Sequence, residues 1–425
     1  RSSDSSGGVK LKFELKYGKD HVEFEIEEKN YMCSLLQNEI EFELKGEEEV
    51  KRALENPIGT KRLKDIVKPG EKIVIVTSDI TRPMPSKEVL PAVINELKLA
   101  EVQEKDITIV MALGSHRGHT EEEKKALVGE VVYNSDVNIM DSDMNRCINL
   151  GKCKNGTPVD IFEPVAKADR IICMGNIEYH YFAGYSGGAK ALMPGVSSHA
   201  AIQANHSNMV KKEAYAGNLD TNPVRQDIDE AGEYIHIDFI VNVILNSKKE
   251  IVKTVAGHYL KAHREGCKVL DELYGIQLEK QADIVIVSPG GFPKDINLYQ
   301  AQKGLDNAKQ AVKDGGIIIL VASAKEKFGE STFEEWMLSK EPHEMIEEIQ
   351  ENFKLGGHKA AAIAMVLQKA KIYIVSDLED DLIRRIHLMP FKTVQEAIDA
   401  ALTELGDGSQ IMIMPAAGST LARYH

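Results

Sequence analysis

Six continuous apolar runs constrain most strongly what this chain can fold into. Segments with helical periodicity separate them, and several of the runs lead into polar loops. Uninterrupted apolar runs are typical of strands that are buried on both faces of a parallel sheet. The alternation of strand, loop and helix indicates a doubly wound α/β fold. The runs lie at residues 72–79, 106–116, 168–176, 282–291, 315–323 and 371–377.

The runs form two groups of three, which predicts two α/β lobes with mainly parallel sheets flanked by helices. We place an N-terminal α/β domain at residues 9–262 and a C-terminal α/β domain at 263–425. The linker between them is expected near 257–266, where the sequence is polar. The apolar segment 410–415 is a last strand that could return to either domain.

Local patterns predict further elements. Residues 9–15 and 21–27 alternate polar and apolar side chains, which predicts an antiparallel hairpin with one wet face. The polar start, RSSDSSGG at residues 1–8, is interpreted as a tag remnant or a disordered tail. Helices are expected at residues 86–99, from about 120 onward, and at 299–313, 332–353 and 359–369.

Composition excludes several classes of function. The chain has 425 residues, 43% hydrophobic and 28% charged, and its net charge is −14. Such an acidic chain is a poor candidate for nonspecific binding to nucleic acid or to anionic membranes. No apolar run approaches the roughly 18 residues of a membrane span. Five cysteines without C-x-x-C spacing fit reduced thiols in the cytoplasm and argue against a zinc site.

Polar side chains follow four of the predicted strands. In open α/β sheets ligands bind outside the carboxyl ends of the strands, so these residues are candidates for a binding or catalytic site. His206 lies further along the chain, after a helical stretch from about Ser198. The residues at the strand exits are Asp79, Thr81 and Arg82, then His116, Arg117 and His119, then His180 and Lys190, and finally Tyr299, Gln300 and Lys303.

Each histidine also has a structural interpretation. His119 is expected to be a solvated residue at a helix start, and His116 could be a hydrogen-bonding loop residue or a catalyst. His180 precedes two aromatic residues and could be a core histidine. His206 stands seven residues after His199, so both could share one helix face. On spacing alone, neither of these two is assigned as a ligand.

The remaining candidates allow similar alternatives. Asp79 and Thr81 could cap the helix that follows the first strand. Lys303 lies in a helical pattern and could be solvated. The segment SGGAK, which ends at Lys190, could be a tight turn that starts a helix close to a strand.

The segment HYFAGYSGGAKALMPG also invites comparison with a phosphate-binding loop. The pattern G-x-x-x-x-G-K-[ST] places a glycine before the lysine and a magnesium-binding hydroxyl after it. Counted from Gly184, Ala189 stands at the second glycine and Ala191 at the hydroxyl position. These two mismatches argue against a nucleoside triphosphate site and leave Lys190 without an assigned role.

Taken together, the inventory of histidines, lysines and an arginine points to acid–base chemistry on a small anionic substrate. Arginine binds carboxylates through two parallel hydrogen bonds. Histidine exchanges protons near neutral pH. The set does not favour hydrolysis by a serine triad, and no G-x-G-x-x-G dinucleotide motif follows a strand.

Several of these segments resemble the nickel-dependent lactate racemase family. They are DITRP, GSHRGHT, HYFAGYSGGAKALMPG with the NH that follows, and YQAQK. The resemblance runs from about residue 9 to the end of the chain. It implies that residues 9–262 are a cofactor-binding domain and that the active site lies in the cleft between two lobes.

The resemblance implies a nickel pincer nucleotide, which is pyridinium-3-thioamide-5-thiocarboxylic acid mononucleotide with bound nickel. Lys190 would tether it covalently through a thioamide, and the glycines before Lys190 would let this bulky group approach the backbone. His206 matches the protein ligand to nickel. Asp79 would contact the cofactor or orient Arg82.

The resemblance also implies the reaction. His116 and His180 match two acid–base histidines, one for each face of the carbon that a racemase inverts. The hydroxyl proton would leave to a histidine while the α-hydrogen leaves as hydride to the cofactor, through transient pyruvate. Arg82 and Lys303 would hold the substrate carboxylate. The flanking pocket residues would be Gln300 and Tyr299.

The implied function is interconversion of D- and L-lactate in the cytoplasm. The implied partners are a small 2-hydroxy carboxylate substrate and the proteins that make and load the cofactor, with no nucleic acid and no membrane. Two alternatives remain open from the sequence. One is a racemase or epimerase of malate, a larger hydroxy acid or a sugar acid, and the other is a noncatalytic carboxylate-binding protein.

Overall fold

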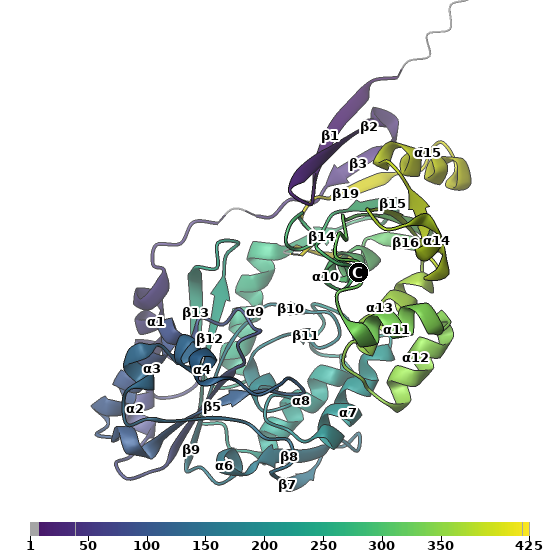
Figure 1. Ribbon diagram of the computed structural model, residues 1–425. Coiled ribbons are helices and arrows are strands. Elements are labelled where there is room, and N and C mark those ends of the chain that lie inside the picture. The colour runs from purple at the N-terminus through teal and green to yellow at the C-terminus, as the bar shows by residue number, and fades with distance from the viewer. Residues whose placement is uncertain (1–7, 39, 419, 425) are drawn as a thin grey trace, which may run out of the picture. The chain divides into compact units, whose positions relative to one another are not determined.

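The computed structural model describes residues 8–38, 40–418 and 420–424, and its chain divides into two compact units (Figure 1). We call residues 39–273 the middle unit. Residues 1–38 and 274–425 together form the second, which we call the split unit. No helix in the described part of the chain is long and apolar enough to cross a membrane.

The middle unit is built on a six-stranded sheet with the order β13-β12-β9-β4-β5-β6. Neighbouring strands are parallel except for the antiparallel pair β12 and β13. Three of these strands are the apolar runs that the sequence predicts. The bounds are β4 Ile73–Ser78, β5 Ile107–Ala112, β6 Asn138–Asp141, β9 Arg170–Asn176, β12 Phe239–Leu245 and β13 Ile251–Gly257.

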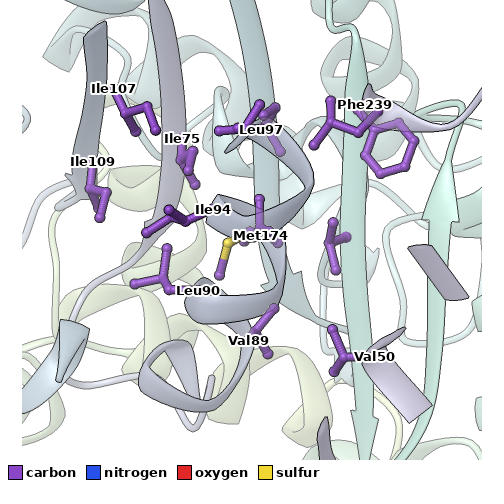
Figure 2. Close-up of a cluster of buried hydrophobic side chains, with 14 of the residues drawn as sticks. Val50, Ile75, Val89, Leu90, Ile94, Leu97, Ile107, Ile109, Met174 and Phe239 are labelled. Atoms are coloured by element: carbon purple, nitrogen blue, oxygen red, sulfur yellow. The ribbon is translucent and has the colours of Figure 1, made fainter. Parts of the chain in front are cut away.

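Helix α3 (Ser86–Leu99) covers one face of this sheet, as the sequence predicts. Its apolar side chains recur at helical spacing, so one stripe faces the strands. Figure 2 shows Leu90, Ile94 and Leu97 of this stripe among the side chains of the sheet. Burying a side chain of this size contributes roughly 1.5–3 kcal/mol each, and the resulting core fixes the strand ends that carry the candidate residues.

Smaller elements complete the middle unit. The pairs β7–β8 and β10–β11 are antiparallel two-stranded ribbons beside the main sheet. The strand bounds are β7 Cys147–Lys152, β8 Pro158–Phe162, β10 Tyr179–His180 and β11 Gly184–Tyr185. The helices are α1 Gly46–Glu55, α2 Leu63–Ile66, α4 Glu121–Val128, α5 Glu130–Tyr133, α6 Glu163–Ala166, α7 His199–His206, α8 Pro223–Tyr234 and α9 Lys261–Tyr274, with short 3₁₀ turns η2 Glu104–Asp106, η3 Gly188–Ala191 and η4 Ser207–Val210.

The split unit has its own six-stranded sheet, with the order β18-β17-β16-β15-β19-β3 and every pair parallel. The strands are β3 Tyr31–Ser34, β15 Ala282–Val287, β16 Val312–Val321, β17 Lys371–Val375, β18 Met389–Phe391 and β19 Ile411–Met414, with a separate parallel pair β14 Gly275–Leu278 and β20 Leu421–Tyr424. The helices are α10 Leu298–Lys309, α11 Ser331–Ser339, α12 Pro342–Glu351, α13 Gly357–Leu367, α14 Asp380–Arg385 and α15 Val394–Leu405, and the turn η1 is Glu28–Asn30.

The N-terminal hairpin belongs to the split unit. Strands β1 (Lys10–Tyr17) and β2 (Asp20–Glu27) pair antiparallel, as their alternating pattern predicts. Leu15, Phe24 and Ile26 on one face join the core of the split unit's sheet. The wet face points away, which explains the alternation.

The fold class is confirmed, but the predicted domain boundaries need correction. Residues 9–38 pack with the C-terminal part of the chain rather than with the first domain. The expected linker at 257–266 is the end of β13 and the start of α9, an amphipathic helix whose polar face resembles a loop in sequence. Strand β19 joins the split unit's sheet, which settles the open placement of 410–415.

Two smaller predictions also change. The single helix expected at 332–353 is two helices, because Pro342 cannot continue α11 and instead occupies the first turn of α12. The predicted tail at residues 1–8 lies outside the described residues except for Gly8.

Candidate active site

Four candidate side chains of the middle unit gather at the carboxyl ends of its parallel strands. Asp79 follows β4, His116 follows β5, and Lys190 lies on η3 after β9. Arg82, Asp79 and Lys190 all influence the pKa of His116 through their charges, which shows that the four groups lie close together. Within the middle unit, the loops after β4, β5 and β9 thus bring these four groups near one another, as the α/β rule predicts.

The segment after β4 is a turn that Asp79 closes. The buried Asp79 carboxylate accepts hydrogen bonds from the backbone N–H of Thr81 at 2.7 Å and from its hydroxyl. The Asp79 carbonyl accepts from the N–H of Arg82 at 3.1 Å. The alternative that Asp79 and Thr81 cap the next helix is wrong, because α3 begins only at Ser86. Asp79 instead fixes the backbone that presents the exposed Arg82.

His119 is not the solvated residue that the sequence predicts, since its side chain is 1% exposed. Its Nδ1 lies 2.6 Å from Oδ1 of Asp141, and its Nε2 accepts from the N–H of Ile80 at 3.0 Å. Because Nε2 accepts a hydrogen bond, the ring donates to Asp141 through Nδ1. His119 thus ties the turn of Asp79 to the end of β6, and no motif in the sequence marks this role.

His116 lies in a tight loop after β5. Its backbone N–H donates to the carbonyl of Leu113 at 2.8 Å, and the N–H of Gly114 donates to Gly195 at 2.9 Å. Burial lowers the pKa of His116, with further lowering by Arg82 and Lys190, while Asp79 partly offsets the shift by raising it. The ring is consequently neutral at neutral pH and able to accept a proton.

His180 is carried by the ribbon β10–β11. Its Nδ1 accepts from the N–H of Ala183 at 3.1 Å, so the ring turns Nε2 away from the ribbon's own backbone. The hydroxyls of Tyr179 and Tyr185 both donate to Asp271 on α9, at 2.7 and 2.6 Å. These bonds anchor the ribbon on both strands and fix where His180 sits.

His206 is the last residue of α7 and is 9% exposed. Phe182 lies between His206 and His180, with ring centroids 5.0 Å from the former and 4.4 Å from the latter. His199, at the other end of α7, is exposed. The structure thus brings His180 and His206 around one aromatic ring.

The turn of residues 185–188, which precedes Lys190, is held at every residue by a buried side chain. Three carbonyls accept and one N–H donates. Arg225 binds Tyr185 O at 3.1 Å and Gly187 O at 3.0 Å, His263 binds Ser186 O at 2.8 Å, and Asn242 Oδ1 accepts from Gly188 N at 2.9 Å. The sequence does not predict these three residues, because they lie far along the chain from Lys190 and outside any motif.

Two glycines of this segment are required by the packing of the protein itself. A Cβ on Gly187 would lie 2.8 Å from Asn242 Oδ1, and one on Gly188 would lie 2.6 Å from Arg225 Nη2. Both residues also adopt positive φ, at 85° and 61°. The close approach at the Cβ positions is made by the protein's own side chains, which is a sufficient reason for glycine at both residues. At Gly114, by contrast, an added Cβ would meet nothing within 4 Å.

Lys190 has an unusual amine for its type. Desolvation of the amine by burial lowers its pKa to about 7, and the positive charges of Arg82 and Arg225 contribute to this shift. The carboxylates of Glu178 and Asp79 act in the opposite direction. A substantial part of the Lys190 population is therefore neutral and nucleophilic at neutral pH.

The segment Gly184–Gly188 also matches G-x-S-x-G, the serine hydrolase pattern. The Ser186 hydroxyl donates to Asn176 O at 2.7 Å and accepts from Glu178 N at 2.9 Å. His263 binds the carbonyl of Ser186 rather than its hydroxyl. Ser186 is thus a structural residue of the turn.

The other three predicted residues lie in the split unit, on the first turns of α10. Asn297 caps this helix by accepting from the N–H of Gln300 at 2.8 Å. Gln300 and Lys303 are exposed, and Tyr299 is half-buried. Lys359 Nζ lies 4.2 Å from the centre of the Tyr299 ring and donates to its carbonyl at 3.0 Å.

Comparison with known proteins gives one consistent family. A model described as the lactate racemase N-terminal domain matches residues 17–217, and one described as the lactate racemase C-terminal domain matches residues 277–421. The chain is 35% identical to a lactate racemase of Thermoanaerobacterium thermosaccharolyticum, covering 96% of this chain and 99% of the relative. It is 33% identical to one of Lactiplantibacillus plantarum, covering 95% and 97%.

Two solved structures are similar to this chain. The lactate racemase apoprotein of Thermoanaerobacterium thermosaccharolyticum superposes with a TM-score of 0.85 at 35% identity, covering 97% of this chain and 100% of that one. A Thermotoga maritima protein superposes with a TM-score of 0.63 at 18% identity, covering 90% and 100%, which shows a shared fold.

Proposed function

Because the chain belongs to the lactate racemase family, we propose that it is an isomerase that interconverts D- and L-lactate. The observation that carries this proposal is the cluster of His116, Arg82 and Lys190 at one sheet edge. It combines a neutral imidazole, a guanidinium and a nucleophilic amine. A 2-hydroxy acid needs a proton acceptor for its hydroxyl and a cation for its carboxylate.

The side chains present fit the nickel pincer nucleotide that the family resemblance implies. Lys190 offers an amine with a pKa of about 7, which suits a covalent thioamide link. His206 offers a nearly buried imidazole, a ligand that suits nickel. In the described part of the chain, the group of metal-ligating side chains is Cys153, Asp227 and Glu230, and it does not include His206. A metal at His206 would therefore take its other donors from a bound group.

When bound, this group supplies the acceptor for the hydride that leaves the substrate's α-carbon. The chain's own residues bind the substrate and handle its proton. We assign removal and return of the hydroxyl proton to His116 and His180, with the roles exchanged between the two enantiomers. Arg82 would hold the carboxylate through its guanidinium fork. Asp79 would keep the backbone of Arg82 in place through its bonds to Thr81.

The roles of the three residues on α10 rest on the sequence resemblance. Lys303 would hold the substrate carboxylate together with Arg82, and Gln300 and Tyr299 would flank the substrate. The exposure of Lys303 and the cap at Asn297, which fixes the start of the helix, are compatible with this assignment. We also propose that the protein works in the cytoplasm, which the free cysteines in the described chain support. Its cofactor would come from loading proteins, as the family resemblance implies.

The direct test is chiral analysis of lactate. Protein co-produced with cofactor-making enzymes is incubated with D-lactate or L-lactate, and both enantiomers are quantified over time. The proposal predicts the same final mixture from either side. Absence of conversion, while a family racemase loaded in parallel is active, would overturn it.

The main alternative is a different 2-hydroxy acid with the same chemistry. The same preparation is therefore assayed with malate, larger hydroxy acids and sugar acids. A kcat/KM for one of them well above that for lactate would reassign the substrate but keep the reaction. Tight carboxylate binding by metal-free protein without any conversion would instead favour the noncatalytic binder.

A further inference from the structure

Arg225 is a fully buried arginine whose side chain is directed at the backbone before Lys190. It is 0% exposed, and its two terminal nitrogens bind the carbonyls of Tyr185 and Gly187. A guanidinium is a rigid planar fork, so binding two carbonyls at once fixes the distance and angle between them. Burying a charge is costly unless the charge is paired and hydrogen-bonded, and Arg225 obtains its partners from the turn and from Asp229. The contacts show that Arg225 serves the turn of residues 185–188.

The helix that carries Arg225 also holds the two histidine-bearing segments. Asn222, the cap of α8, donates to Phe182 O at 2.9 Å, within the ribbon of His180. Asn205, next to His206, donates to Val224 O at 3.0 Å. The start of α8 is thus a common support for the ribbon, the turn before Lys190 and helix α7.

Charged groups from α8 and α9 lie beneath the turn. Arg225 and Arg264 both pair with the carboxylate of Asp229, with Arg225 Nε 3.2 Å from Asp229 Oδ1. The neutral ring of His263 lies between them, because burial and both arginines lower its pKa well below the ordinary value. Its Nε2 donates to Ser186 O, and its Nδ1 accepts from Arg264.

The groups that face Lys190 come from several elements. Asp79 and Arg82 follow β4, Glu178 follows β9, and Arg225 is on α8, and all four act on the Lys190 amine. His116, after β5, faces the same group. The two arginines disfavour the charged amine and the two carboxylates favour it. Of the two arginines, only Arg225 also binds the backbone turn that leads to Lys190.

We propose that Arg225 is a positioning residue for Lys190, holding the turn of residues 185–188 and setting the reactivity of the Lys190 amine. The inference rests on the proposed function only in naming that amine as the cofactor tether. The reactivity itself is a property of the protein before any cofactor is attached. It can therefore be measured on the apoprotein, independently of racemase activity.

The experiment is competitive labelling of the apoprotein with a trace of acetic anhydride between pH 5 and 10. The free amine attacks one carbonyl carbon, an N–C bond forms, and acetate leaves with the amine proton released to solvent. Quantifying the acetylated peptide that contains Lys190 at each pH gives the midpoint for loss of the amine proton. The wild-type midpoint is expected near 7.

Arg225→Met removes the charge and the fork. The midpoint for Lys190 should rise by roughly half to one pH unit, which lowers labelling at pH 6 by about three- to tenfold. Arg264→Met is the matched control. It removes an arginine of the same cluster whose described hydrogen bonds go to His263 and Asp229, and the midpoint should stay where it is.

Arg225→Lys separates position from charge and guards against misfolding of Arg225→Met. Lysine keeps the charge but cannot bind Tyr185 O and Gly187 O through one planar group. The labelling midpoint should stay near 7, while amide hydrogen exchange in the peptide spanning residues 185–190 becomes at least severalfold faster.

Three results would each contradict the role proposed for Arg225. A folded Arg225→Met protein with an unchanged midpoint would overturn the proposal, as would an equal shift in Arg264→Met. If Arg225→Met is insoluble, unchanged hydrogen exchange in Arg225→Lys would overturn it. None of these results depends on whether the loaded protein racemises lactate.

Discussion

The two six-stranded sheets of this protein end in polar loops that are used in different ways. In the middle unit the strand exits carry His116, Arg82 and Lys190, whose side chains act on one another electrostatically. In the split unit the exits of β15 and β16 carry Asp295 and Ser323, which are buried and bind the protein's own backbone. The loops after parallel strands therefore carry the proposed reacting groups in the middle unit, whereas Asp295 and Ser323 show that such loops also serve packing in the split unit.

Two carboxylates of the split unit bind the N-terminal hairpin. Asp295 Oδ2 accepts from Gly18 N at 2.8 Å and from Ser323 N at 3.1 Å. The Tyr17 hydroxyl donates to Asp377 at 2.7 Å. These bonds hold the tip of the hairpin to the strand exits. A polar residue that follows a strand lies at the edge of the sheet. Its role depends on whether its side chain binds the protein's own backbone or lies beside other charged side chains.

The largest expected difference between the two units is the loss of turnover when a histidine of the middle unit is removed. His116→Ala or His180→Ala should lower turnover by about 100-fold or more, because each removes a general acid–base group. Nickel content of the loaded protein should not change. Initial racemisation rates from both enantiomers, together with nickel analysis, check this. Retained turnover in either variant would remove that histidine from the mechanism.

The matching change in the split unit should affect stability. Asp295→Ala leaves the N–H groups of Gly18 and Ser323 without their acceptor and should cost about 1–3 kcal/mol of unfolding free energy. Urea unfolding measures this, with Asp377→Ala as a more exposed control that costs less. An unchanged unfolding midpoint for Asp295→Ala would show that these bonds do not anchor the hairpin.

Lys190 differs from Asp295 in its expected effect on stability. A group placed for chemistry, with a lowered pKa, should reduce the free energy of unfolding. Its pKa is about 7 in the folded protein, whereas an ordinary lysine titrates near 10.4. Between these values the unfolded chain binds a proton that the folded chain does not. The stability of the wild type should consequently rise with pH across this window.

Lys190→Met lacks this titration. The variant should be more stable than the wild type at pH 7, and its advantage should shrink as the pH approaches 10. Urea unfolding at several pH values, with Lys212→Met on the surface as the control, tests the sign. An advantage that grows with pH would contradict the lowered pKa.

The smallest expected effect is that of His119→Ala. Losing the acceptor for Ile80 N should loosen the turn that presents Arg82 and should raise KM for lactate severalfold with little change in kcat. His236→Ala, whose side chain is 85% exposed, is the control. A fall in kcat with constant KM would show instead that His119 acts on the chemical step.

Much of the fold could be predicted from sequence because buried parallel strands are long apolar runs. The three first-half runs and helix 86–99 appear as β4, β5, β9 and α3. The hairpin was also recognisable, but its destination was not. The pairing of β3 with β19 and the packing of Leu15 join segments from opposite ends of the chain, which no local pattern encodes.

The site divides in the same way. Its candidate reacting residues lie in loops after strands, so the sequence pattern predicts His116, Arg82 and Lys190 as one set. The residues that hold them cannot be predicted, because Arg225 and His263 are recognised only by the backbone carbonyls that they bind. The burial of His119 is also not encoded locally, since its partner, Asp141, comes from the end of another strand.

The most direct test of the central claim is the mass of the loaded protein. The chain is co-produced with cofactor-making enzymes, and its intact mass, nickel content and peptide map are measured. We predict stoichiometric nickel and an adduct of nucleotide mass on the peptide that contains Lys190. An unmodified, nickel-free chain, obtained while a family racemase is loaded in the same cells, would contradict the account of Lys190 as a cofactor tether.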